Sequence, residues 1–187
     1  MSRSLEFLLT ATLVGLGTAQ PAFAAPATAE DLAVLRAVLA PECGRSDPGY
    51  HLLSTRAASV DMSDQVPSDW PEADALTAQL RARAESRGSW SGVRICPKVL
   101  VRRDGDIERL IENAPNLDAG WKKFYSAYPG ARGVIRVSLP AYSGDGNRAV
   151  VFTGEGCGSL CGSGDVVELE KKDGVWHRTR AQATWIS

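Results

Sequence analysis

Four cysteines are the residues of this chain best suited to chemistry, and two of them lie only four positions apart. Cys157 and Cys161 stand within a glycine-rich stretch that runs from Gly154 to Gly164. If residues 158–160 form a three-residue hairpin loop, the two cysteines face each other on adjacent strands with Cα atoms roughly 4.5 to 5.5 Å apart, which suits a disulfide. A fully extended path would separate them by about 13 Å and forbid the bond. The spacing therefore predicts a hairpin and a disulfide together.

The other two cysteines, Cys43 and Cys96, complete an even count that fits two bridges in an oxidising compartment. Four cysteines allow three pairings, and a bridge within the hairpin leaves Cys43 to join Cys96. The sequence ranks this pairing first without fixing it. Loop entropy assigns about 2 kcal/mol to the short loop and about 4 kcal/mol to the long one, so the long bridge would matter more for stability.

The alternative chemistry for Cys157 and Cys161 is a thiol redox pair, or a Cu(I) site that His177 completes, because Cu(I) prefers soft thiolate ligands. A redox pair needs a helix N-terminus or a cationic neighbour to lower the pKa of one thiol, and a glycine-rich hairpin indicates neither. Zinc is disfavoured because His51 and His177 are far apart in sequence. The favoured interpretation is a structural disulfide, with no metal and no cofactor.

The remaining polar residues contain no complete catalytic motif. Ser159 at the hairpin tip has no base near it in sequence, so it is interpreted as a turn residue. Glu168 and Glu170 would point to one face of a strand about 7 Å apart, a spacing that glycosidases can use, but on an open strand we expect both to be solvated. His177 is expected on that same exposed face. The sequence favours a non-enzymatic protein, and a hydrolase is the competing class.

The N-terminal segment predicts export. Arg3 is followed by an apolar run and then by Ala-Phe-Ala ending at Ala24, the order of a secretory signal peptide over residues 1–24. The run falls short of the about 20 apolar residues that a spanning helix needs, so we expect no stable membrane anchor and a periplasmic or secreted location. The net charge of −1, from 21 Lys and Arg against 22 Asp and Glu, disfavours a nucleic-acid partner. Arg81, Arg83 and Arg87 are expected on a solvated helix face.

Periodicity predicts helices in the first half of the chain and strands in the second. Helices are indicated over residues 28–40 and 68–86, with shorter helical stretches over 106–111 and 121–128. Residues 41–67 resemble a loop with a brief strand at most, and 93–103 a strand. Four further strands separated by short turns predict an antiparallel meander: Val134–Leu139, Arg148–Thr153, Asp165–Lys171 and Val175–Arg180.

The expected architecture is a single α+β domain over residues 25–187. Its N-terminal helices pack on one face of a C-terminal four-stranded antiparallel meander. Alternation sets Val167, Leu169 and Trp176 toward the helices and places Glu168 and Glu170 on the opposite face.

Residues 121–187, the C-terminal third, contain a strand, a cysteine tip and a second hairpin in a fixed order. The strand is Ala149–Val151, the tip is Cys-Gly-Ser-Leu-Cys-Gly from Cys157, and the hairpin is Lys-Lys-Asp-Gly-Val-Trp ending at Trp176, with Tyr-Pro-Gly from Tyr128 before them. Together these motifs resemble a pattern in small exported bacterial proteins that have no assigned function. The resemblance implies a bacterial envelope protein with a hairpin fold and implies no activity.

The favoured functional hypothesis is a non-enzymatic exported protein that binds an unknown macromolecular partner in the cell envelope. A loop closed by a disulfide loses less conformational entropy on docking, and this one presents Leu160 at its tip. Leu160 is therefore the candidate contact residue. The alternative is a thiol- or copper-handling protein, or a hydrolase, that uses Cys157, Cys161 and His177.

Overall fold

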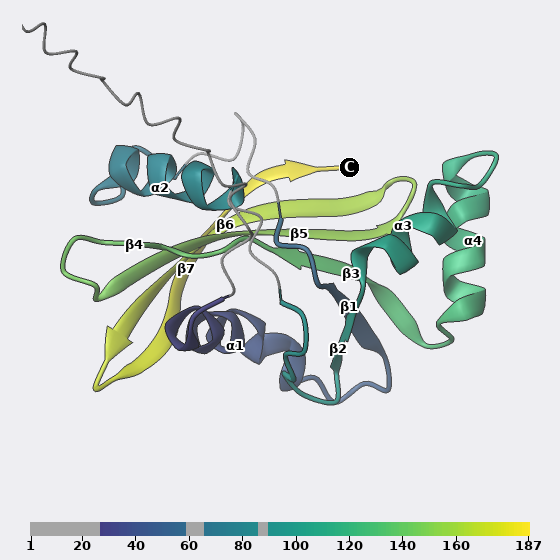
Figure 1. Cartoon of the computed structure of the whole chain (residues 1–187), viewed down its shortest axis with the longest axis horizontal. Coiled ribbons are helices and arrows are strands. Elements are labelled where there is room, and N and C mark those ends of the chain that lie inside the picture. Colours follow the sequence, from purple (N-terminus) through teal and green to yellow (C-terminus); the bar gives the residue numbers. More distant parts are fainter. Residues whose placement is uncertain (1–26, 59–65, 86–89) are drawn as a thin grey trace, which may run out of the picture.

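The chain forms a mixed seven-stranded sheet with helices on both faces (Figure 1). This computed structural model describes residues 27–58, 66–85 and 90–187, so the predicted signal peptide lies outside the described residues. The elements, in chain order, are α1 (Ala29–Cys43), β1 (Tyr50–Ser54), α2 (Ala73–Glu85), β2 (Val99–Arg102), α3 (Asp104–Ile111), α4 (Leu117–Ala127), β3 (Ala131–Val137), β4 (Ala141–Tyr142), β5 (Arg148–Gly158), β6 (Cys161–Lys172) and β7 (Val175–Ile186).

The sheet combines a parallel part with the predicted antiparallel meander. The strand order is β2-β1-β3-β5-β6-β7, and the short β4 pairs with β5. β1 runs parallel to both β2 and β3, whereas the pairs from β3 to β7 are antiparallel. The α+β class is confirmed, but the sheet has seven strands and is mixed, whereas four antiparallel strands were predicted. The prediction missed β1, which lies within the segment expected to be mostly loop.

β1 escaped the sequence analysis because it is buried on both faces. Its residues Leu52 and Leu53 are both fully buried, one against α3 and α4 and the other against α1. A strand covered on both sides shows no alternation of apolar and polar residues, so the period-two signal is absent.

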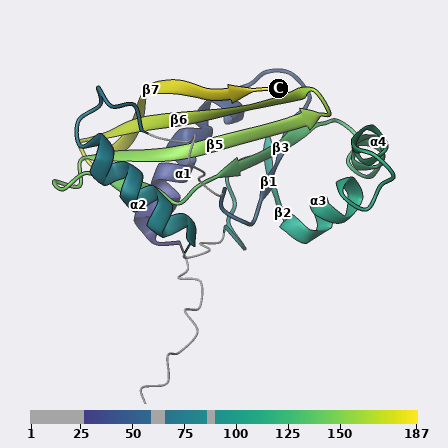
Figure 2. The same ribbon diagram turned by 90° about the horizontal axis from the view of Figure 1, so that it is seen from above.

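Helices cover both faces of the sheet, contrary to the expectation of one covered face. On one face, Leu35 and Leu39 of α1 belong to the same core cluster as Val167, Leu169 and Trp176, as alternation predicted. On the other face, α2 packs over the meander through the apolar cluster of Leu76, Leu80, Val150, Phe152 and Val166. Figure 2 shows α3 and α4 gathered at the end of the sheet that contains β1, β2 and β3. β5 and β6 contain consecutive apolar residues, which place apolar side chains on both faces of the sheet.

The first turn of α1 is tied to α2 and β4 by Asp31, which is completely buried. Thr28 and Asp31 form a capping box at the start of the helix. The Asp31 carboxylate also accepts a hydrogen bond from Arg83 at 2.8 Å and one from the Tyr142 hydroxyl at 2.8 Å. Arg83 is thus half-buried in an ion pair, and its predicted place on a solvated face was wrong.

β5 and β6 form a long hairpin whose end is closed by a disulfide between Cys157 and Cys161, with Cα atoms 5.1 Å apart. The connection is a two-residue turn of Ser159 and Leu160, and Gly158 is the residue opposite Cys161. Cys157 is the extra residue of a bulge, so the disulfide is present but the three-residue loop with facing cysteines was wrong. The predicted second bridge joins Cys43 to Cys96 across 5.9 Å between Cα atoms.

β7 is an edge strand whose pairing with β6 is interrupted twice. The register moves from Gly164 opposite Trp185 to Asp165 opposite Ala183, which leaves Thr184 as an extra residue. A second shift, between Glu168 and Leu169 on β6, leaves Thr179 as an extra residue. Each is a β-bulge, which bends the strand and increases its twist.

Candidate functional site

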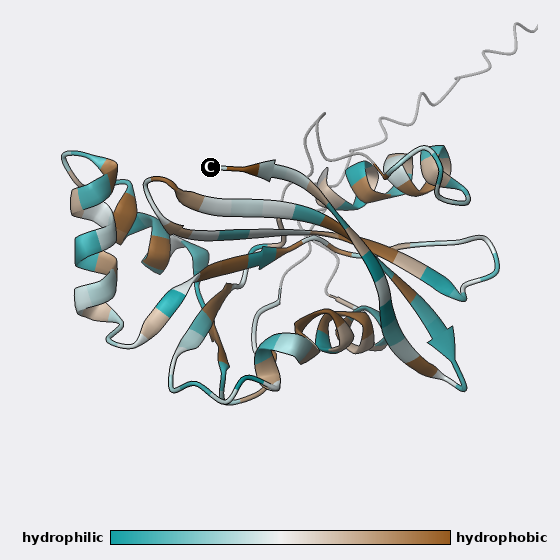
Figure 3. Cartoon of the chain, turned by 180° about the vertical axis from the view of Figure 1, so that it is seen from behind, coloured by the Kyte–Doolittle hydropathy of each residue, from teal (hydrophilic) through white to brown (hydrophobic). Residues whose placement is uncertain are grey.

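Exposed apolar side chains gather around the end of the β5–β6 hairpin. The described residues include five exposed large apolar side chains, and four of these lie at this end of the molecule. We call these four residues the tip surface, with exposed fractions of 49% for Leu117, 88% for Leu160, 39% for Trp185 and 79% for Ile186. The fifth, Val175, is 56% exposed and starts β7 at the opposite end of the β6–β7 pair. Figure 3 shows apolar colouring both at the hairpin tip and at the end of β7.

Hydrogen bonds and register bring the tip surface together. The Ser159 hydroxyl in the turn donates a hydrogen bond to Asp118, which places the turn beside the start of α4 and next to Leu117. The backbone N–H of Ser187 donates to the Gly162 carbonyl at 3.0 Å, which holds the end of β7 beside the start of β6. Leu117, Leu160 and Ile186 therefore belong to one end of the fold although they are distant in sequence.

Two glycines of β6 provide the seat for Trp185. A Cβ atom at Gly164 would clash with the indole of Trp185, and one at Gly162 would also meet the ring closely. The absence of side chains here lets the indole lie against the β6 backbone. The glycine-rich sequence was interpreted as a turn, but two of its five glycines, Gly162 and Gly164, make room for an aromatic ring.

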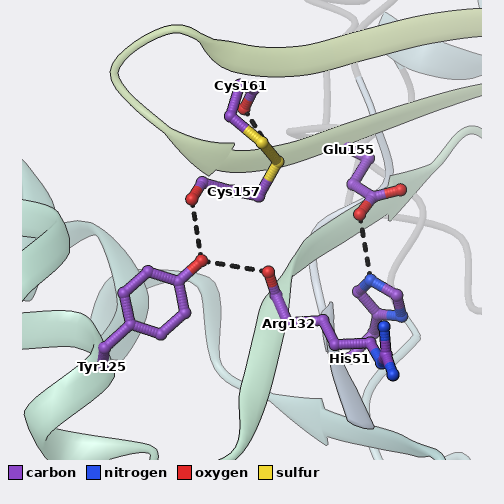
Figure 4. Close-up of a disulfide and its surroundings, with 6 residues drawn as sticks. All are labelled: His51, Tyr125, Arg132, Glu155, Cys157 and Cys161. Atoms are coloured by element: carbon purple, nitrogen blue, oxygen red, sulfur yellow. Dashed lines mark hydrogen bonds and ion pairs between the residues drawn. A yellow bond between two sulfur atoms is a disulfide. The ribbon is translucent and has the colours of Figure 1, made fainter. Parts of the chain in front are cut away.

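The hairpin end is held to α4 and β3 by Tyr125, as Figure 4 shows. Its hydroxyl lies 2.7 Å from the Cys157 carbonyl and 3.0 Å from the Arg132 carbonyl, and it shares its single proton between them. Burial, together with the negative charge of Glu155, raises the pKa of the Tyr125 hydroxyl, so it remains a donor at neutral pH. With the disulfide, this bond fixes the turn that presents Leu160.

Behind the tip, His51 of β1 lies between two carboxylates. His51 is 4% exposed, its Nδ1 lies 3.1 Å from Glu42 Oε2 and its Nε2 lies 2.9 Å from Glu155 Oε1. Nε2 makes a hydrogen bond with Glu155, whereas Nδ1 lies close to Glu42 Oε2 without forming one. The hydrogen bond from His51 holds the pKa of the Glu155 carboxyl below its ordinary value.

The His51 cluster joins three elements of the fold. It links the last turn of α1 through Glu42 to β1 and, through Glu155, to β5. Glu42 and Glu155 also help to line an adjacent cavity of about 110 Å³. Nothing near His51 in the sequence indicated that these two carboxylates lie beside it.

The residues of the alternative copper or thiol site are not brought together. Cys157 and Cys161 are bonded to each other, at the start of β6. His177 is exposed and lies opposite Glu170, toward the far end of β6. Among the described residues, no group of three His, Cys, Asp or Glu side chains is arranged to hold a metal ion.

The prediction of a solvated Glu168 was wrong. Glu168 is 3% exposed, and its carboxylate accepts a hydrogen bond from Arg180 at 2.7 Å and lies 3.7 Å from Arg148. The Arg180 guanidinium in turn lies 4.2 Å from the ring centre of Trp70, in the segment that precedes α2. The segment before α2 therefore covers this ion pair, on a face of the sheet that was expected to carry no helices. A glycosidase role for Glu168 and Glu170, which the sequence had already disfavoured, gains no support, because Glu168 is paired with these arginines.

A second polar cluster, missed by sequence reasoning, lies where the parallel strands end. The buried Ser54 hydroxyl at the end of β1 donates to Asp104, the first residue of α3, at 2.6 Å. Burial raises the pKa of Asp104, but hydrogen bonds from Ser54 and Glu108 outweigh it and hold that pKa low. The hydrogen bond with Asp104 raises the pKa of Glu108. Arg136 of β3 and Arg56 neutralise the cluster at 3.5 and 3.7 Å from Asp104, so it serves to fix the start of α3.

In the described part of the chain, no helix is both long enough and apolar enough to cross a membrane. Comparison with known proteins found no matching family model, no matching curated protein and no matching solved structure.

Proposed function

We propose that this chain is an exported, non-enzymatic protein that docks onto a component of the bacterial cell envelope through its tip surface. The predicted N-terminal signal and the two disulfides, which persist in oxidising compartments, support the proposed location.

The observation that carries the proposal is the gathering of four of the five exposed large apolar side chains on one hairpin end. Exposed apolar residues scattered singly are normal on a protein surface, whereas a group is typical of an interaction site. The turn between them is fixed by the Cys157–Cys161 bond and by Tyr125. A surface that is already ordered loses little conformational entropy when it binds.

The competing thiol, copper or hydrolase function has no comparable support. The two thiols of the hairpin are consumed in a bond, and the nitrogens of the buried His51 both face carboxylates.

Site-specific photo-crosslinking tests the proposal without knowledge of the partner. A photoreactive amino acid replaces Leu160 in one form of the full chain and Val175 in another, and each is exported in bacterial cells before irradiation. Val175 is the matched control because it is also exposed and apolar but lies at the opposite end of β7. We expect adducts from position 160 and few from position 175. Equal labelling at both positions, or none at position 160, would remove the tip surface as the docking site.

A further inference from the structure

We infer that the component on which the tip surface docks is the surface of a lipid bilayer. This inference rests on the proposed docking function and names its partner. Three features of the tip surface favour lipid over a protein: its area, its relief and the charges beside it.

The exposed apolar area of the tip surface is divided among separate side chains, of which Leu160 and Ile186 are the most exposed, at 88% and 79%. A bilayer requires no minimum matched area, because each inserted side chain leaves water independently of the others. The largely exposed side chains of Leu160 and Ile186, together with the indole of Trp185, suffice for reversible attachment.

The tip surface protrudes. Leu160 extends from a two-residue turn, Ile186 from the end of a strand and Leu117 from the start of a helix. A protein partner would need a surface with hollows that match these separate side chains. A fluid bilayer accommodates them without such a match, and Trp185 is of the residue type favoured at the level of the lipid headgroups.

Two exposed cationic side chains lie on α4, the helix that begins with Leu117. Lys122 and Lys123 are exposed on α4 and have no salt bridge with other described residues. They follow Leu117 by five and six positions, which is roughly 8 Å along the helix axis, and their flexible side chains extend the reach of each ammonium. The acid nearest to Leu117 is Asp118, which accepts a hydrogen bond from Ser159. The two lysines provide the charge complementarity that anionic headgroups recognise.

Vesicle flotation tests the inference directly. The exported chain, with its N-terminus determined by intact mass, is mixed with phosphatidylcholine vesicles that contain either no phosphatidylglycerol or a substantial fraction of it. We expect the parent chain to float with both and more strongly with the anionic vesicles. Leu160→Asp should weaken the partition about tenfold or more, because a fully inserted leucine is replaced by a charge. Val175→Asp, which makes the same chemical change outside the tip surface, should leave it unaltered.

The lysines are tested by the doubly substituted Lys122→Gln/Lys123→Gln chain, which should bind neutral vesicles as the parent does and lose the extra affinity for anionic ones. All variants change exposed side chains, and equal thermal unfolding confirms that each is folded. Failure of the parent chain to float, or equal weakening by the substitutions at positions 160 and 175, would overturn the inference.

Failure of this inference is distinguishable from failure of the docking function. A protein adduct at position 160 without vesicle binding would overturn the lipid assignment and leave the docking function in place. A dimer in analytical ultracentrifugation that Leu160→Asp abolishes would likewise overturn it and name a second copy of the chain as the partner. A lipid adduct at position 160 supports both.

Discussion

Replacing Glu155 with glutamine should destabilise the protein in a pH-dependent manner. The substitution preserves size and an acceptor oxygen but converts the charge-assisted hydrogen bond to His51 into a neutral one. Hydrogen bonds to charged groups contribute about 1.5 to 3 kcal/mol, and neutral ones about half as much. Because the Glu155 side chain is 40% exposed, solvent screening reduces the difference, and we expect a loss of about 1 kcal/mol at pH 7.

The sign of the pH dependence follows from the direction of the pKa shift. In the folded chain the pKa of Glu155 is lowered from its ordinary value of 4.5 by the hydrogen bond from His51. The stabilisation that the Glu155 carboxylate contributes is therefore present above pH 4.5. It is lost as the pH falls through the pKa of Glu155 in the folded chain, because the carboxyl then takes up a proton. The parent chain and the Glu155→Gln chain should converge in stability at acidic pH.

Urea unfolding at pH 7, 5.5 and 3.5 measures the effect as a difference in the free energy of unfolding. The control is Glu170→Gln, because Glu170 has a similarly exposed side chain whose nearest cation is Lys172, at 3.1 Å. That surface pair should contribute little at any pH. A loss for Glu155→Gln that stays constant down to pH 3.5, or that equals the control at pH 7, would refute the stabilising role of the hydrogen bond between His51 and the Glu155 carboxylate.

Three further outcomes are expected. The native chain should show no free thiol on titration, and replacing both Cys157 and Cys161 with serine should lower the free energy of unfolding by about 2 kcal/mol, measured in urea. Gly164→Ala should displace Trp185, which shifts the tryptophan emission maximum and costs about 1 to 3 kcal/mol, whereas alanine at an open glycine should do neither. Asp31→Ala should cost about 3 kcal/mol in thermal unfolding, because it removes one half of the capping box of α1 and the buried acid of the ion pair with Arg83.

The sequence predicted what is encoded locally. The hairpin with its disulfide was predictable because the spacing of Cys157 and Cys161 and the turn between them determine one another. The helical stretch over residues 121–128 was likewise predictable from periodicity, and its aromatic side chains pack in a cluster with β1 and β3.

What was missed depends on contacts between distant segments. His51 and Glu155 are 104 positions apart, and nothing in either neighbourhood indicates that they meet. Glu168 has the alternation of a solvent-facing residue, and only the path of the segment before α2 across that face buries it. The tip surface was predicted at Leu160 alone, because Leu117 and Ile186 join it through tertiary contacts.

The interrupted pairing of β7 bears on how the protein behaves when crowded. A long outer strand with an unbroken row of backbone donors and acceptors invites a neighbour to extend the sheet and starts fibres. Here the two supernumerary threonines, Thr179 and Thr184, twist that border at two places, and Arg178 and Arg180 put positive charge along it. Molecules that are concentrated side by side on a surface would therefore resist joining their sheets through β7.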